Sequence, residues 1–316
     1  MKKITLLCLL SVICNITYAQ LLVEDFDYTQ GDYLTSHGWF TQYGASSSVG
    51  VTNGLTFENY AESNIGNAAL LDIEDSNQLH KGFTETTSGN LYVAFMFQPT
   101  IAAKDGWFFS LRDNKLDGSN FNFRGRIFIT TDNKIGLTFG NNANKIYSST
   151  ALNSSKTYLI VLKYTIISGE NNDAVSLFVF DTFPESEPAT AEIGPLTDNA
   201  LVDINPANII LRSYSASNWL VIDGIRVAKS WAEAVKKREN TQLTNNAAPA
   251  NRFFVTNNTL HLSITQSVNE LAIFDLTGKC LTRDNIKLNS GNYAITLKTG
   301  IYILKMDNLT EKVIVK

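Results

Sequence analysis

Short apolar runs with a two-residue period recur along most of this chain and constrain it to an all-β fold. Leu91–Phe97 is apolar at every position, which predicts a central strand covered on both faces. Arg126–Thr131 and Ile135–Phe139 flank Asp132–Lys134, a gap with turn formers that is typical of a hairpin. Further strands are expected at residues 157–165, 175–181, 208–214 and 219–227. Strands about ten residues apart, with turns between them, favour an antiparallel sandwich or jelly roll.

One short helix is expected at residues 230–238, where Ser230 can cap the first turn and three basic residues suit the last. The polar stretch 184–195 is interpreted as a long loop, because strand patterns continue on both sides of it. Polar and small residues at 239–251 predict an exposed linker.

Residues 1–19 have the composition of a secretory signal peptide. Two lysines precede the apolar run Ile4–Ile16, and Ala19 supplies a small residue at the expected cleavage point. A transmembrane anchor needs about 20 apolar residues. This run is shorter, so no transmembrane segment is expected in the mature chain. Lipidation at Cys14 is an alternative, which the bulky residue before it disfavours.

Removal of this peptide changes the cysteine count and the charge. Cys280 becomes the single cysteine, so the mature chain forms no internal disulfide and needs an ordinary hydrophobic core. With two lysines removed, 24 basic residues remain against 30 acidic ones, and the formal net charge falls from −4 to −6. This mild acidity gives no support for nucleic-acid binding, which usually requires a basic surface.

Alternation continues through residues 252–316 and predicts a second, small sandwich that forms an independent domain. Its expected inner residues are Leu260, Leu262, Ile264, Leu271, Ile273, Ile286, Leu288, Ile295, Leu297, Ile301, Ile303, Val313 and Val315.

The same residues, 252–316, resemble the type A C-terminal sorting domain of the type IX secretion system of Bacteroidetes, an immunoglobulin-like β-sandwich. The resemblance rests on Asp275–Lys279, Gly300–Lys305 and Lys312–Lys316. The sorting signal that it implies comprises Asp275, Gly278, Gly300, Tyr302, Lys312, Val313, Val315 and Lys316. It also implies recognition by the secretion translocon, cleavage by the sorting protease near the linker, and delivery to the outer-membrane surface or the medium.

Residues 20–238 resemble the laminin G-like or concanavalin-like domains, which are jelly rolls of two stacked sheets. The motifs that carry this resemblance are Glu24–Tyr28, Gly31–Trp39, Gly66–Leu71, Ile222–Ala228 and Ser230–Trp231. The first and last strands of such folds pair, which would place Glu24–Phe26 beside Ile222–Gly224. The same fold carries lectins, glycosidases, adhesion modules and spacers, so it implies no single function.

Laminarinase-type members of that family use two or three carboxylates that alternate along one strand. Asp72 and Glu74 alternate, but Leu70 stands where a further Glu is needed, which favours a solvated strand edge or loop. The three histidines are far apart and have no second ligand at metal spacing. Cys280 has no catalytic partner nearby, and neither a Gly-x-Ser-x-Gly elbow nor a phosphate-binding loop occurs. Catalysis is therefore not supported by the sequence.

Calcium is the inorganic ligand that the resemblance suggests, because laminin G-like sandwiches often hold one. Glu24, Asp25 and Asp223 would converge if the terminal strands pair, and calcium prefers six to eight oxygen ligands. The alternative is that these acids cap turns or face water.

Carbohydrate binding needs exposed aromatic rings flanked by polar groups. Trp107, Tyr214, Asn218 and Trp219 are the leading candidates, and Phe40 and Tyr43 are further ones near the start. Trp39 and Trp231 are better explained by packing. The expected function is an exported, noncatalytic module that binds a glycan or an extracellular matrix ligand. A glycan hydrolase with an atypical site and a structural component of the cell surface remain as alternatives.

Overall fold

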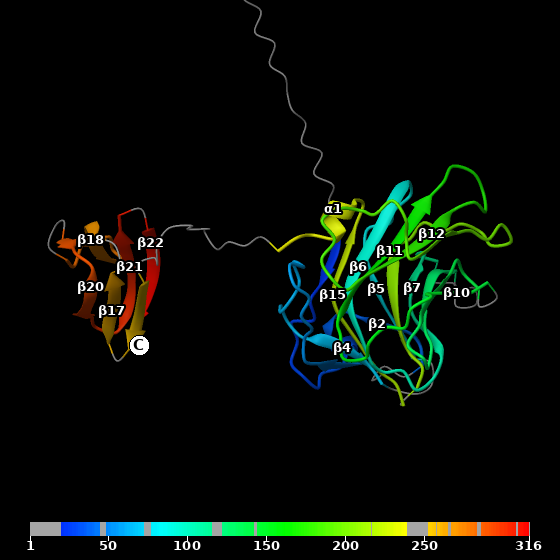
Figure 1. Ribbon diagram of the computed structural model, residues 1–316, viewed down its shortest axis with the longest axis horizontal. Coiled ribbons are helices and arrows are strands. Elements are labelled where there is room, and N and C mark those ends of the chain that lie inside the picture. The colour runs from blue at the N-terminus through cyan, green and yellow to red at the C-terminus, as the bar shows by residue number, and fades with distance from the viewer. Residues whose placement is uncertain are drawn as a thin grey trace, which may run out of the picture. The chain divides into compact units, whose positions relative to one another are not determined.

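A computed structural model describes residues 20–44, 49–72, 77–115, 122–141, 144–215, 217–238, 252–256, 258–264, 267–282, 286–307 and 309–315. The chain divides into two compact units, Met1–Glu239 and Asn240–Lys316, which Figure 1 shows. The expected signal peptide, residues 1–19, and the expected linker, residues 239–251, lie outside the described residues.

The first unit contains two antiparallel sheets. The order of the eight-stranded sheet is β13 (Ile193–Leu196), β12 (Ala174–Phe180), β11 (Tyr158–Ile166), β6 (Gly89–Ile101), β15 (Trp219–Ala228), β4 (Ala68–Leu71) and β3 (Gly50–Thr52), with β1 (Gln20–Glu24) also paired to β15. The order of the seven-stranded sheet is β10 (Ile146–Tyr147), β9 (Ile135–Thr138), β8 (Phe123–Ile129), β7 (Gly106–Arg112), β14 (Asn208–Ser213), β5 (Asn77–Gly82) and β2 (Phe40–Tyr43). The expectation of an all-β, two-sheet antiparallel sandwich is confirmed.

Strand β6 explains why the two sheets stack. Phe95 stacks on Phe109 of β7 with ring centroids 4.7 Å apart, and Phe97 stacks on Phe108 at 4.6 Å. Side chains of opposite parity on β6, such as Met96, are buried in a second cluster on the other face of the sheet. Both faces of this central strand are covered, as its uniformly apolar sequence predicts.

The first and last strands of this unit are neighbours. β1 pairs antiparallel with β15, and the register places Glu24 opposite Ile225 and Gln20 opposite Ala228. The expected pairing of the terminal strands is confirmed. The hairpin expected around residues 132–134 is also present, as β8 and β9.

The helix at the end of this unit is shorter than the sequence indicates. α1 spans Trp231–Ala234, and Ser230 caps it by accepting a hydrogen bond from the Glu233 amide. The chain then leaves the helix because the Arg238 amide bonds to the Asn59 carbonyl and Lys237 forms a β-bridge with Tyr60. Tertiary pairing therefore overrides the helical preference of residues 235–238. A 3-10 helix, η1 (Leu34–His37), precedes β2.

The polar stretch 184–195 is only partly a loop. Its last residues begin strand β13, which pairs with β12 at the edge of the eight-stranded sheet. β13 contains Gly194 and Pro195, so its sequence has no apolar period, and proline is tolerated there because the strand lies at a sheet edge.

The second unit is a small sandwich of two antiparallel sheets. The first sheet contains β16 (Arg252–Thr256), β17 (Thr259–Ile264) and β20 (Gly291–Thr296), and the second contains β19 (Ile286–Leu288), β18 (Val268–Asp275), β21 (Gly300–Met306) and β22 (Leu309–Val315). Leu260, Leu262, Val313 and Val315 are buried in its core, as expected.

The parity predicted for strand β21 is wrong. Tyr302, Leu304 and Met306 line the core, whereas Ile301 and Ile303 are only half-buried on the other side. Both parities of this strand are largely apolar, so alternation alone cannot select the inner face. The register with β22 does so by placing Tyr302 opposite Val313.

The residues of the predicted sorting signal have clear structural positions. Asp275 closes the turn after β18 by accepting hydrogen bonds from the Thr277 hydroxyl (2.6 Å) and from the amides of Thr277 (2.9 Å) and Lys279 (3.0 Å). The bond from the Thr277 hydroxyl, followed by the amide bonds, lowers the pKa of Asp275. Gly278 occupies the same turn at φ +82°. Gly300 pairs with Val315, and the Tyr302 hydroxyl bonds to the Lys298 carbonyl.

Lys312, another residue of the predicted signal, is exposed on β22 and pairs with Ile303 of β21. Lys316 lies outside the described residues.

Strand β22 provides a direct test of this core. We expect the double variant V313A/V315A to destabilise the second unit by about 3 kcal/mol, because it removes four buried methylene-sized groups worth about 0.8 kcal/mol each. Hydrogen exchange of the full chain should accelerate in residues 286–315 and remain unchanged in the first unit. I314A is the matched control, since Ile314 lies between them and is 49% exposed. Equal effects of the two variants would contradict this register.

Candidate functional site

The outer face of the seven-stranded sheet gathers the polar and aromatic groups that could meet a ligand. We define the outer face as the face turned away from the core between the sheets. Leu79, Leu111 and Leu211 point into that core, so alternate residues on these strands point outward. The side chains of the outer face that matter below are Phe40, His80, Trp107, Arg112, Arg126, Phe128, Asn208 and Arg212.

Trp107 lies at the centre of this face between two guanidinium groups. Arg126 of β8 lies 5.2 Å from the Trp107 ring centroid, and Arg212 of β14 lies 4.8 Å from it. Strands β8 and β14 flank β7, so the two arginines approach the tryptophan from opposite sides. Burial, followed by the charges of Arg212 and Arg124, lowers the pKa of Arg126 to about 10. Arg126 therefore stays positively charged at neutral pH.

A second polar row crosses β7, β14 and β5. Arg112 pairs with Asn208 in register, and the Asn208 amide oxygen lies 3.1 Å from Nδ1 of His80. Burial lowers the pKa of His80, which keeps its ring neutral at pH 7. The row ends at Phe40, whose ring centroid lies 5.6 Å from that of His80 and whose side chain is 61% exposed.

Arg112 carries a buried charge in this row. Its side chain is fully buried, and Nε donates to the Asp113 carbonyl at 3.1 Å. Its two terminal nitrogens make no hydrogen bond with any described residue. A buried guanidinium without a carboxylate partner is energetically unfavourable, and it adds positive potential to the outer face.

Three of the four residues predicted to bind a glycan lie close together. The Tyr214 hydroxyl donates to the Lys104 carbonyl at 2.8 Å. Asn218 accepts from the Lys104 amide at 2.9 Å and donates to the same carbonyl at 3.2 Å. Arg212 contacts both Tyr214 and Trp107. Tyr214 and Asn218 thus anchor the loop between β6 and β7.

Trp219, the fourth predicted residue, opens β15 and is 44% exposed beside Ile101. A ligand-binding role for these four residues stays a prediction.

The arginines of the outer face were missed in the sequence. The usable signal was the spacing of Arg126 and Phe128 on one strand and of Ile210 and Arg212 on another, which places each pair on one face. Which of these residues meet across strands depends on the register of the strands. A bulge in β7 between Trp107 and Phe109 shifts that register, so the spacing within one strand does not predict the contacts of Trp107.

Glu24, one of the predicted calcium ligands, makes hydrogen bonds and an ion pair within the protein. It is buried and accepts hydrogen bonds from the Phe26 amide (3.0 Å), the Tyr28 hydroxyl (2.9 Å) and Trp39 Nε1 (3.1 Å), and it forms an ion pair with Lys81. Four donors surround this carboxylate, so its lone pairs are largely used by the protein itself.

Asp223 offers a better cation ligand. It is fully buried, Oδ2 accepts from the Leu55 amide at 2.7 Å, and Oδ1 has no hydrogen-bond partner among the described residues. Two glycines allow oxygens to crowd here, since a Cβ on Gly54 would lie 2.9 Å from the Gly66 carbonyl and 3.4 Å from Asp223 Oδ2. A Cβ on Gly66 would lie 2.0 Å from the Asp25 carbonyl. These carbonyls and Asp223 fit a hard cation, and calcium stays a prediction there.

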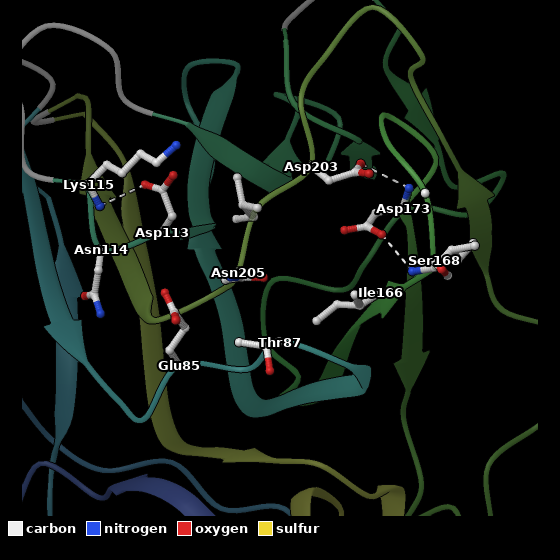
Figure 2. A pocket seen from close by; sticks show the side chains of 13 residues that line it. Glu85, Thr87, Asp113, Asn114, Lys115, Ile166, Ser168, Asp173, Asp203 and Asn205 are labelled. Carbon is white, nitrogen blue, oxygen red and sulfur yellow. Dashed lines mark hydrogen bonds between the residues drawn. The ribbon is translucent and has the colours of Figure 1, made fainter.

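A polar cavity of about 520 Å³ lies at one end of the sandwich. Figure 2 shows Asp113 and Asn114 on one side of it, Asp173 and Asp203 on the other, and Glu85 at a third position. None of the described residues that line it is aromatic.

The carboxylates of this cavity hold loops. Asp173 accepts from the Tyr164 hydroxyl and from the Ile167 amide, both at 2.7 Å, and burial raises its pKa. Asp203 accepts from the amides of Asn172 and Asp173, both at 3.1 Å. The cavity is therefore built from turn-stabilising acids.

The catalytic candidates are dispersed. Asp72 follows β4 in the eight-stranded sheet, and Glu74 lies outside the described residues. His37 contacts Asp32 and stacks on Tyr28, while His261 belongs to the second unit. Within the described part of the chain, no group of three His, Cys, Asp or Glu side chains is placed to hold a metal ion.

The second unit belongs to a known class of export signal. Residues 256–316 match the family described as "Secretion system C-terminal sorting domain". The chain therefore carries a type IX sorting domain at its C-terminus, and this domain implies export to the cell surface or the medium. No curated protein matches the chain. Across the residues described, no helix has the length and apolar character needed to span a membrane.

Several solved structures are similar to this chain over about two thirds of its length. They include endo-1,3-beta-glucanase from Streptomyces sioyaensis, with 15% identity over 67% of this chain and 96% of that chain and a TM-score of 0.42. The globular domain of T. cruzi calreticulin shows 13% identity over 69% and 90%, with a TM-score of 0.40. Beta-agarase A from Zobellia galactanivorans shows 12% over 66% and 90%, with a TM-score of 0.40. Likeness at this level carries no argument about activity.

The buried carboxyl of Asp223 predicts a pH-dependent stability. Burial raises its pKa to about 8, so the folded state retains a proton that the unfolded state releases above about pH 4. The free energy of unfolding should therefore fall as pH rises from 4 to 8, and D223N should remove this contribution. We expect calcium to raise the melting temperature of the wild type at pH 8 and to leave D223N unchanged. Identical pH profiles of the two proteins would refute the assignment.

Proposed function

We propose that the first unit is a noncatalytic module that binds a glycan or an extracellular matrix ligand on the outer face, and that the sorting domain delivers it. The observation that carries this proposal is the exposed ring of Phe40 beside the half-buried imidazole of His80, whose Nδ1 is held by the buried Asn208 amide. An exposed aromatic ring beside an imidazole is a combination that can stack on a sugar ring and bond its hydroxyls. Export supports the same proposal, because such ligands lie outside the cell.

Delivery by the type IX machinery follows from the sorting domain, and we further propose that the sorting protease cuts between the two units. Residues 239–251, which contain the boundary between the two units in the sequence, are mostly polar and small and contain no apolar period. Segments of this composition are typical protease substrates.

The glycan proposal is tested with the purified chain on a glycan array, with calcium and with chelator. We expect binding that F40A lowers about tenfold, because loss of one stacked ring costs roughly 1–2 kcal/mol. Y33A is the matched control, since Tyr33 is an exposed aromatic residue (45%) outside this face. Shortened glycan products would instead establish a hydrolase. A blank array under both conditions would favour a structural surface component.

The sorting role is tested by deleting residues 312–316 in a host with the type IX system. This deletion removes Val313 and Val315 from the core and part of β22 from the sheet. We expect the protein to accumulate in the periplasm with its first unit folded, as measured by fractionation and limited proteolysis. I314A should still reach the surface or the medium. Unchanged delivery of the deletion variant would refute the role of β22.

A further inference from the structure

The edge of the seven-stranded sheet presents two exposed aromatic rings on its outer face. β2 ends the sheet and pairs with β5, so that Phe40 lies opposite His80 and Tyr43 lies opposite Gln78. Residues that are opposite each other in an antiparallel ladder point to the same face. Leu79, between His80 and Gln78, points into the core. Both rings therefore belong to the outer face, where Phe40 is 61% and Tyr43 is 58% exposed. We call these two rings the edge platform.

A bulge in β2 places both rings on one face. Phe40 and Tyr43 are three positions apart, and in a regular strand they would point to opposite faces. The register shifts between Thr41 and Tyr43, which inserts one extra residue and turns Tyr43 outward. Their partners on β5 are two residues apart, which separates the two ring positions by about 7 Å along the strand. This separation is comparable with the length of one sugar unit in a linear chain.

His80 presents a hydrogen-bond acceptor beside Phe40. The side-chain nitrogen of Asn208 donates to the Asp113 carbonyl at 3.1 Å and to Asn114 Oδ1 at 3.2 Å, so its oxygen faces His80 Nδ1 at 3.1 Å. An amide oxygen only accepts, so Nδ1 carries the proton of the neutral ring and Nε2 is the acceptor. Nε2 makes no hydrogen bond with a described residue, which leaves this acceptor for a sugar hydroxyl.

Gln78 supplies a second polar group, beside Tyr43. Its amide oxygen is buried and has no hydrogen-bond partner within the described part of the chain. The amide nitrogen carries two donor hydrogens, and none of the described residues accepts from it. Each ring of the edge platform therefore has a polar neighbour on β5, one an acceptor and the other a donor. This is the arrangement that a sugar ring with its hydroxyl groups requires.

We propose that the edge platform binds a linear glycan lengthwise, with consecutive sugar units stacked on Phe40 and Tyr43 and their hydroxyls bonded to His80 Nε2 and the Gln78 amide. This inference rests on the proposed glycan-binding function and specifies the ligand as an unbranched chain of at least two units. Both rings lie on one strand, so the line that joins them follows β2. Since β2 is the last strand on its side of the described sheet, a longer chain can continue past either ring.

The test measures, by calorimetry, binding of the full chain to cellohexaose, laminarihexaose, xylohexaose and chitohexaose, and to the monosaccharide of each. We expect at least one hexasaccharide to bind more than tenfold more tightly than its monosaccharide, because a monosaccharide covers only one ring. Y43A should lower the affinity for that hexasaccharide about tenfold and remove most of the advantage of length. A further linear glycan that the array identifies is tested in the same way.

Two control variants separate the ring of Tyr43 from general effects, and melting temperatures establish that each variant is folded. Y43F keeps the ring and should bind like the wild type. Y33A removes an aromatic residue that is 45% exposed outside this face, and it should also bind like the wild type.

The outcomes distinguish this inference from the glycan proposal. If Y43A binds the hexasaccharide as tightly as the wild type while F40A binds it weakly, the edge platform is wrong and the glycan proposal stands. The same conclusion follows if every glycan that binds is branched or a single sugar. Absence of binding to every hexasaccharide and every array glycan would overturn both.

Discussion

The first unit depends on the stacking of its two sheets, and the buried carboxylate of Glu24 links one sheet to the other through an ion pair. Glu24 ends β1 of the eight-stranded sheet, and its ion-pair partner Lys81 belongs to β5 of the seven-stranded sheet. Trp39 donates to the same carboxylate, and Lys81 lies 5.7 Å from the Trp39 ring centroid. Breaking a buried pair of this kind typically destabilises a protein by about 3–5 kcal/mol, since the remaining charge is left without a partner. The outer face is therefore supported by a charge pair on the opposite side of its sheet.

Much of this fold could be predicted because strand period and burial agree. Leu91–Phe97 is apolar on both faces and becomes the central strand β6. The errors occur where local pattern is ambiguous or is overruled by distant contacts. Strand β21 offers two apolar faces, so its inner face is set by pairing with β22. Residues 235–238 favour helix, but pairing with Asn59 and Tyr60 removes them from it.

The candidate site was less predictable, because it depends on neighbours that are distant in sequence. Trp107 was identified as a possible sugar platform, yet its ring is flanked by Arg126 and Arg212 from adjacent strands. Glu24 was identified as a possible calcium ligand, yet donors from β5 and the segment before β2 surround it. Asp223 shows the reverse case: the sequence indicates an acid at a strand centre, and only packing reveals that one of its oxygens has no hydrogen-bond partner among the described residues.

The pairing of β15 has a consequence for the order of folding. One edge of β15 pairs with β6, while its other edge pairs with β4 through Leu220–Ile222 and with β1 through Ile225–Ala228. Three strands made early during synthesis therefore share one partner that is made about 120 residues or more after them. Contacts of such high sequence separation slow folding, because a long loop must close before they form. The eight-stranded sheet is completed only after β15, which ends at Ala228, has joined it. In a nascent or half-translocated chain that lacks β15, the edges of β1, β4 and β6 that pair with it are therefore left open.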